Sequence, residues 1–128
     1  MRITLCALMS VGFSIVTSSV THAEPLDVPI IERSSDGLDT CGLAEVHGLK
    51  VGGDGFLAVR SGPGTKYRKI DELRNGNQIW VFETRGNWQG IIYGRDLVEC
   101  SPVSEDRILP HEGEKGWVHG KWVRGLAG

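Results

Sequence analysis

Alternating apolar and polar residues predict short β-strands in the central part of the chain. Residues 78–84 are β-branched and aromatic, as strands are. Ile79 and Val81 share one face of that segment, so Trp80 and Phe82 share the other. An Asn-Gly-Asn turn at 75–77 is a hairpin signal. The pattern predicts a small antiparallel barrel. We expect its core to contain Val59, Ile79, Val81, Ile91 and Val118.

Two flanking stretches lack this alternation. Residues 24–43 hold two prolines and a Ser-Ser-Asp-Gly run, which predicts an extended arm or linker. An apolar patch within it, Val28, Ile30 and Ile31, would suit a short strand at a sheet edge. Residues 94–115 are irregular and charged, and they are long for a connection in so small a domain. The last predicted strand lies at residues 116–123.

The first 23 residues are typical of a secretory signal peptide. Arg2 precedes an apolar run at 3–16, and a Thr-His-Ala sequence ending at Ala23 offers small residues three and one before a cut. The run is too short for the roughly 20 residues that span a bilayer. Cys6 lies at its start, which does not suit a lipoprotein. We expect cleavage after Ala23, export to the periplasm or the extracellular space, and no membrane span in the mature chain.

Length and composition exclude several classes of protein. A chain of 128 residues is too short for a kinase or a two-domain dehydrogenase, so we expect one domain. Its 18 glycines argue against a helical bundle, because glycine destabilises a helix interior by about 1 kcal/mol relative to alanine. The formal net charge of −2 gives no indication of nucleic-acid binding.

The two cysteines of the mature chain predict a disulfide. Cys41 and Cys100 form an even pair, and an exported protein matures in an oxidising compartment. A reactive thiol with His47 as its base is the alternative, and it suits that compartment less well.

Catalytic and metal-binding motifs are missing from the sequence. His111, Glu112 and Glu114 are possible ligands, but they lie on a glycine-containing loop without a second cluster. The paired carboxylates and the remaining histidines, His47 and His119, form no known catalytic or metal spacing. No P-loop, dinucleotide fingerprint or Gly-x-Ser-x-Gly sequence occurs. We expect no metal, no cofactor and no enzymatic activity.

An ordered set of motifs resembles the bacterial SH3 domain. The set comprises Leu-Ala-Val-Arg-Ser-Gly-Pro-Gly at 57–64, Gly76 before Ile-Trp-Val at 79–81, Trp-Gln-Gly-Ile at 88–91, and Gly-Trp-Val at 116–118 followed by Trp122. Each motif alone is weak, whereas their order is specific, and together they cover about residues 46–126. The resemblance implies an all-β fold, a small SH3-like barrel of about five to seven short antiparallel strands at 44–128. An arm at 24–43 precedes the barrel, and an insertion of about 20 residues at 94–115 precedes its last strand.

The resemblance also implies a function. It predicts a monomeric, non-catalytic module that recognises peptidoglycan, or a peptide of an envelope protein, through an aromatic groove. A scaffold that makes protein contacts and binds no small ligand is the alternative, and a small cell-wall hydrolase is a minor one. The family pattern runs almost directly into its last strand, so the insertion here is a departure. We expect the disulfide to tie the arm to this insertion, which then covers or rebuilds the groove.

Aromatic and basic side chains are the candidates for ligand binding. Exposed rings beside loops can stack on a peptide or a sugar, and the rings considered are Tyr67, Trp80, Trp88, Trp117 and Trp122. We expect Trp88 and Trp117 to be packing residues. A basic run, Arg60, Lys66, Arg68, Lys69 and Arg74, either meets a ligand carboxylate or forms a solvated face. The predicted binding residues are Tyr67, Trp80, Trp122, Arg60 and Lys66.

Overall fold

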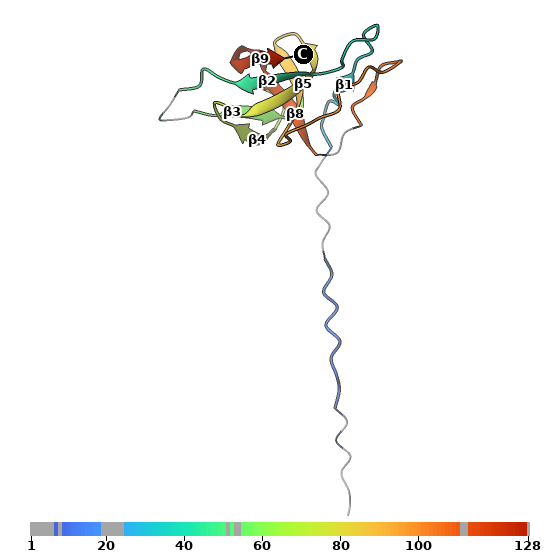
Figure 1. Cartoon of the computed structure of the whole chain (residues 1–128). Coiled ribbons are helices and arrows are strands. Elements are labelled where there is room, and N and C mark those ends of the chain that lie inside the picture. Colours follow the sequence, from blue (N-terminus) through green and yellow to red (C-terminus); the bar gives the residue numbers. More distant parts are fainter. Residues whose placement is uncertain are drawn as a thin grey trace, which may run out of the picture.

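Seven strands form one antiparallel sheet, as a computed structural model of the chain shows (Figure 1). The structure describes residues 7, 9–18, 25–50, 52, 55–110 and 113–127. In sheet order the strands are β4 (Lys69–Leu73), β3 (Leu57–Arg60), β8 (Glu114–His119), β6 (Trp88–Tyr93), β5 (Gln78–Arg85), β2 (Gly42–Val46) and β9 (Val123–Ala127). A single 3-10 turn, η1 (Gly120–Trp122), precedes β9 in the described part of the chain. The predicted all-β class is confirmed.

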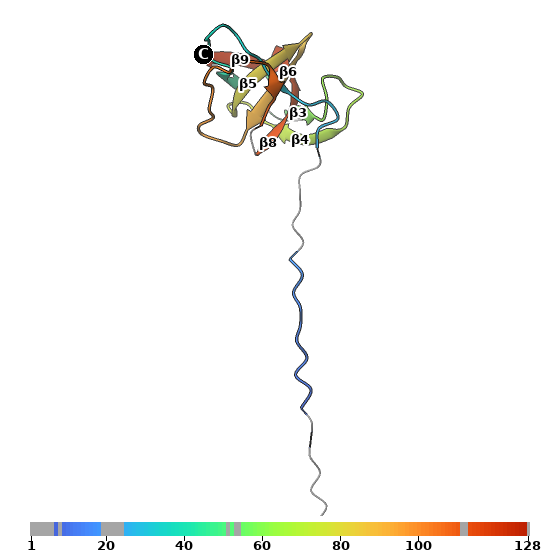
Figure 2. The same ribbon diagram turned by 90° about the vertical axis from the view of Figure 1, so that its right-hand side faces the viewer.

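The sheet is open, with β4 and β9 as its edge strands. In Figure 2, β9 and β5 lie on one side of the folded part, and β3 and β4 lie on the other. The apolar side chains of residues 9–18 are outside this fold, since Met9 and Phe13 are 93% and 91% exposed. The predicted cut after Ala23 falls outside the described residues.

One face of the sheet packs around a first hydrophobic core. Val59, Ile79, Ile91 and Val118 are completely buried in it, which confirms four of the five predicted core residues. Val81 is only partly buried and packs against the same core. The remaining buried members come from β2, β3, β4 and β6, and they are Ala44, Val46, Leu57, Leu73 and Tyr93.

The opposite face of the sheet carries a second hydrophobic core. Its buried members come from the arm, the sheet and the insertion, and they are Ile30, Cys41, Phe82, Ile92, Leu109 and Trp117. In the arm, β1 (Ile31–Glu32) pairs with β7 (Arg107–Ile108) of the insertion. The predicted short strand in the arm therefore exists, although it pairs with the insertion instead of the main sheet. The arm and the insertion together form a cover over this face.

A glycine in β6 lets the cover approach the sheet. A Cβ added at Gly90 would lie 2.8 Å from Cγ2 of Ile30, closer than real Cβ contacts. Because only a residue without a side chain leaves this space, Ile30 can be completely buried against the sheet.

Two buried carboxylates anchor the cover. The side chains of Glu83 and Glu32 are each only 2% exposed. Glu83 accepts hydrogen bonds from the backbone N–H of Ile31 at 2.6 Å and from Arg33 Nη2 at 2.9 Å. Glu32 accepts one from Arg107 Nε at 2.7 Å. Charge-assisted bonds of this kind satisfy carboxylates that would otherwise be costly to bury.

The predicted disulfide between Cys41 and Cys100 is present and closes the cover. It joins the residue before β2 to the insertion across a sequence separation of 59 residues. Beside it, the N–H of Thr40 donates to the carbonyl of Cys100 at 2.8 Å. The arm is thus tied to the insertion, as the sequence predicted.

Candidate functional site

Three of the five predicted binding residues meet at the connection between β3 and β4. Arg60 Nη1 donates to the carbonyl oxygen of Tyr67 at 3.0 Å, and Lys66 Nζ lies 5.3 Å from the centre of the Tyr67 ring. The ring packs on Gly62, where an added Cβ would lie 2.5 Å from ring atoms. A residue without a side chain is therefore needed at Gly62 for the ring to pack there.

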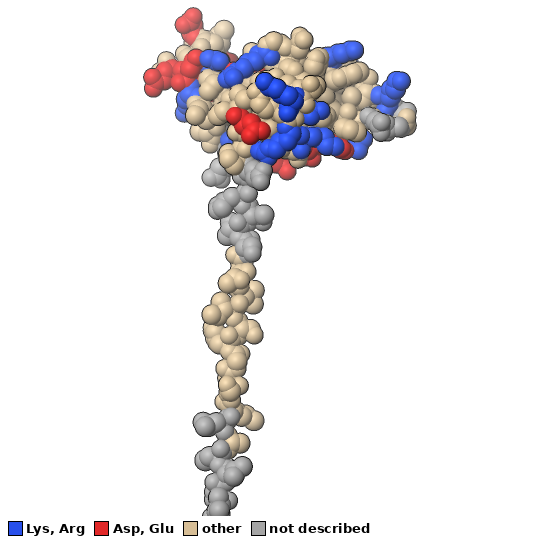
Figure 3. All heavy atoms as spheres, turned by 180° about the vertical axis from the view of Figure 1, so that it is seen from behind, with Lys and Arg blue, Asp and Glu red and all other residues tan. Residues whose placement is uncertain are grey.

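The other side chains of the basic run form hydrogen bonds or ion pairs with residues of the same chain. Arg68 Nη2 donates to the carbonyl of Pro25 at 2.9 Å. Lys69 and Arg74 form ion pairs with Glu72 at 2.6 and 3.3 Å. Figure 3 shows Lys and Arg side chains spread over the face that is seen from behind. Most of the run is thus a solvated, ion-paired surface, and Arg60 and Lys66 remain as its candidates for a ligand.

The other two predicted residues lie elsewhere in the fold. Trp80 packs against the second core, and its Nε1–H donates to the carbonyl of Arg95 in the insertion at 3.3 Å. Trp122 packs against the first core beside Gly48, and Lys121 Nζ lies 5.0 Å from its ring centre. Tyr67, Trp80 and Trp122 therefore pack against three different parts of the protein. Any shared groove for them stays a prediction.

The remaining tryptophans have packing roles. Trp117 is completely buried in the second core, and Trp88 is half-buried against the same core. The Trp117 Nε1–H donates to the carbonyl of Val28 in the arm at 2.9 Å. Trp88 makes an edge contact with the ring of His119. Trp80, Phe82, Trp88 and Trp117 lie on one face of the sheet, which we call the aromatic face. The arm and the insertion cover this face.

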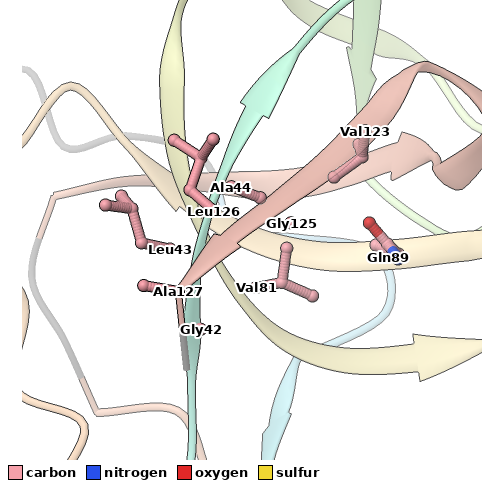
Figure 4. A pocket seen from close by; sticks show the side chains of 9 residues that line it. All are labelled: Gly42, Leu43, Ala44, Val81, Gln89, Val123, Gly125, Leu126 and Ala127. Atoms are coloured by element: carbon pink, nitrogen blue, oxygen red, sulfur yellow. The ribbon is translucent and has the colours of Figure 1, made fainter.

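An open cavity of about 460 Å³ lies beside β9 (Figure 4). Its lining comes from β2, β5, β6 and β9, and it consists of Gly42, Leu43, Ala44, Val81, Gln89, Val123, Gly125, Leu126 and Ala127. Gln89 supplies the one polar side chain among them. Its Oε1 is buried and has no hydrogen-bond partner among the described residues. Apart from Gln89 its lining side chains are aliphatic, and polar backbone atoms share the surface with them, so this open hollow is a candidate ligand site. We refer to it as the β9 cavity.

A bulge between β2 and β9 shapes the β9 cavity. The register places Leu43 opposite Ala127 and Ala44 opposite Gly125, so Leu126 has no partner on β2. A bulge bends its strand and redirects a side chain. At Gly125 an added Cβ would meet no atom within 4 Å. The bend and the small residues together leave the cavity open.

Sequence reasoning did not identify the β9 cavity. The available indications were the small residues Gly125 and Ala127 in an otherwise strand-like segment. A second indication was Gln89, which lies two residues before Ile91 and therefore shares its core-facing side.

A second, acidic cavity of about 390 Å³ lies between β4, β6 and the insertion. Asp71, Glu72, Asp96 and Glu114 line it together with Arg95. No group of three or more His, Cys, Asp or Glu residues could hold a metal ion in the described part of the chain. The sequence candidates His111 and Glu112 lie outside that part.

Tyr93 borders the acidic cavity, and we expect it to limit stability at alkaline pH. Burial, and then its hydrogen bond of 3.0 Å to Asp71, raise the pKa of the Tyr93 hydroxyl well above its usual value of 10.0. Its ionised form is disfavoured in the folded protein. The stabilisation is therefore present below pH 10 and lost as the pH rises towards the raised pKa.

An absorbance titration of the Tyr67→Phe variant reports Tyr93 alone, because the chain has two tyrosines. Tyrosinate should appear only well above pH 10, and Tyr93→Phe should reduce the alkaline loss of stability. Reversible ionisation of Tyr93 at pH 10 in the folded protein would contradict this prediction.

Comparison with known protein families gives one match. The family described as the bacterial SH3 domain matches residues 55–124, which is more than half of the chain. The match begins just before β3 and ends within β9. Searches for similar curated proteins and for similar solved structures found no match. Among the described residues, no helix has the length and apolar character needed to cross a membrane.

Proposed function

The chain belongs to the bacterial SH3 domain family, and from this premise we propose that it is an exported, non-catalytic module that binds peptidoglycan or a peptide of an envelope protein. Membership of this family indicates a binding module, and such domains are common in envelope proteins. The ligand, its site and the compartment are our proposal.

Two features support export. The largely apolar segment 9–18 contributes no residue to either hydrophobic core, so it does not stabilise the fold. A cleaved signal peptide accounts for such a segment. The disulfide between Cys41 and Cys100 belongs to an oxidising compartment, such as the periplasm or the extracellular space.

The β9 cavity is the observation that carries the proposed binding role. A buried acceptor without a hydrogen bond costs about 1–3 kcal/mol. Gln89 Oε1 is buried, so its side chain must turn towards the cavity before a ligand N–H can pair with it and recover this free energy, while an aliphatic side chain would fill the space beside the aliphatic lining. A peptide supplies both groups. The aromatic groove expected from the sequence is a weaker candidate, because the cover occupies that face.

A scaffold role is the second candidate, and the insertion favours it. Leu97 and Ile108 of the insertion are 84% and 64% exposed. Two exposed aliphatic side chains on a segment fixed by a disulfide would suit a contact with another protein. In that case the β9 cavity would take no ligand.

We expect Gly125→Leu to weaken ligand binding without unfolding the protein. The new side chain enters open space in the β9 cavity, and Gly125 has no positive φ that a larger residue would strain. The assay is retention of the mature protein on purified sacculi and on arrays of envelope-protein peptides. Affinity should fall about tenfold or more, which corresponds to about 1.4 kcal/mol.

Ser104→Leu is the matched control, since it adds the same side chain to an exposed site on the insertion. It should bind like the wild type. Retention on neither probe would contradict the proposed function and leave the scaffold role. Release of soluble muropeptides from the sacculi would indicate a hydrolase instead.

A further inference from the structure

We infer that the ligand is an uncharged, extended segment of another protein, which adds as a strand to the free edge of β9 and places an apolar side chain in the β9 cavity. This inference rests on the proposed function and narrows it to one kind of partner and one mode of binding. Four observations carry it: the charges on the two sheet edges, the pairing of β9, the position of the β9 cavity, and the unpartnered Gln89.

The two edges of the main sheet differ in charge. β4 carries Lys69, Asp71 and Glu72 in five residues, and Lys69 and Glu72 form an ion pair at 2.6 Å. Charged side chains on an edge strand prevent other chains from pairing with it. β9 has the sequence Val-Arg-Gly-Leu-Ala, and its one charge, Arg124, forms an ion pair with Glu45. β4 thus carries three charged side chains that oppose strand addition, whereas β9 carries one charge and a bulge.

The backbone of β9 is available on its outer side. Among the described strands, β9 pairs with β2 alone. In an antiparallel pair, alternate residues direct their N–H and C=O groups away from the partner strand. A five-residue edge can thus offer two or three such positions to an added strand. Peptides that bind by strand addition gain affinity from these main-chain hydrogen bonds.

The β9 cavity lies where an added strand would need a side-chain pocket. In Figure 4, the labelled side chains of β2, β5 and β6 surround β9. Val81, Val123 and Leu126 offer an aliphatic lining, and Gln89 Oε1 offers an acceptor without a partner. In strand addition, pockets for alternate side chains give specificity. One apolar side chain in the cavity and one N–H donor near Gln89 would complete the site.

The lack of charge in the β9 cavity favours a segment of a protein chain over a stem peptide of peptidoglycan as the ligand. The β9 cavity has no charged lining residue, and Arg124 is already paired with Glu45. A ligand carboxylate there would lose its hydration without gaining a cation, which is costly. Stem peptides of peptidoglycan carry free carboxylates, whereas a segment of a protein chain can be uncharged. The edge of β9 therefore suits a protein segment, and peptidoglycan becomes an outcome of the test.

The test follows hydrogen exchange of backbone amides in the oxidised, full-length mature protein. The probe is a capped peptide of alternating threonine and valine, and a capped peptide of alternating glutamate and valine is its charged counterpart. We expect the uncharged peptide to slow exchange of alternate β9 amides about tenfold or more and to shift the side-chain amide signal of Gln89. The amides of β4 should not change. Gly125→Leu should weaken these effects, and Ser104→Leu should retain them.

Several results would overturn the inference. These are equal protection of β4 and β9, equal binding of the charged peptide, or no protection of β9 by either peptide. A peptide-free dimer that Gly125→Leu dissociates would assign the edge to a second copy of the chain. Sacculus binding that Gly125→Leu weakens, without protection of β9 by the uncharged peptide, would retain the proposed function and reject strand addition. If the protein neither binds sacculi nor shows protection of β9 by the uncharged peptide, both the proposed function and strand addition are rejected.

Discussion

Replacing Trp117 by alanine is expected to lower the free energy of unfolding by about 3–5 kcal/mol, the range for truncating a buried tryptophan. Trp117 belongs to β8, and its side chain is completely buried in the second core against the arm. Its Nε1–H bonds the carbonyl of Val28, and the Arg85 guanidinium lies 5.3 Å from its ring centre. The substitution removes these contacts and leaves a cavity under the cover. Denaturant unfolding of the oxidised mature protein measures the loss.

Trp88→Ala is the matched control for this prediction. Trp88 contacts the same second core but is only partly buried, so its truncation should cost clearly less. Losses of similar size for the two variants would contradict the prediction that the complete burial of Trp117 makes its truncation more costly.

Removing the disulfide is expected to cost about 4 kcal/mol, because its loop of 59 residues would no longer be restrained in the unfolded chain. The double variant Cys41→Ala, Cys100→Ala avoids a lone thiol. A loss of this size is a large part of the stability of a small domain, which is typically about 5–15 kcal/mol. Unfolding midpoints of the variant and the oxidised wild type measure it.

The same variant tests whether the covered face of the sheet and the β9 cavity have separate roles, in stability and in ligand binding. The disulfide fixes the cover, whereas the β9 cavity opens at the first core. Cys41 directly precedes Gly42 of the cavity lining, but Cys41 packs in the second core. Under conditions in which the variant is folded, its affinity for a ligand of the cavity should therefore fall less than that of Gly125→Leu. Unchanged stability, or lost binding in the folded variant, would contradict this division.

The sequence predicts the sheet well because its patterns are local. The alternation at 79–82 correctly separates Ile79 from Trp80 and Phe82. The alternation does not show whether the second face of the sheet is exposed to solvent. Phe82 is buried there because the arm and the insertion cover it. That contact joins Ile30 to Leu109, which are far apart in the sequence and lie in stretches without periodicity.

None of the predicted binding residues lines the β9 cavity, and their role in binding stays a prediction. Arg60, Lys66 and Tyr67 are close in the sequence and meet in the structure. The β9 cavity depends instead on a register shift between distant strands, and on a glutamine whose missing partner is a property of the packed chain. Neither feature has a sequence motif, because small residues at a chain end are common and carry little information.

We propose that the ligand binds in the β9 cavity and not on the sheet face that the arm and the insertion cover. Chemical-shift mapping tests it most directly, with muropeptides and the capped threonine-valine peptide as probes and isotope-labelled mature protein. We expect the largest changes at the Gln89 side-chain amide and at the methyl groups of Val123 and Leu126. Largest changes at Lys66 and Tyr67, or at Trp80, with an unperturbed cavity would contradict it.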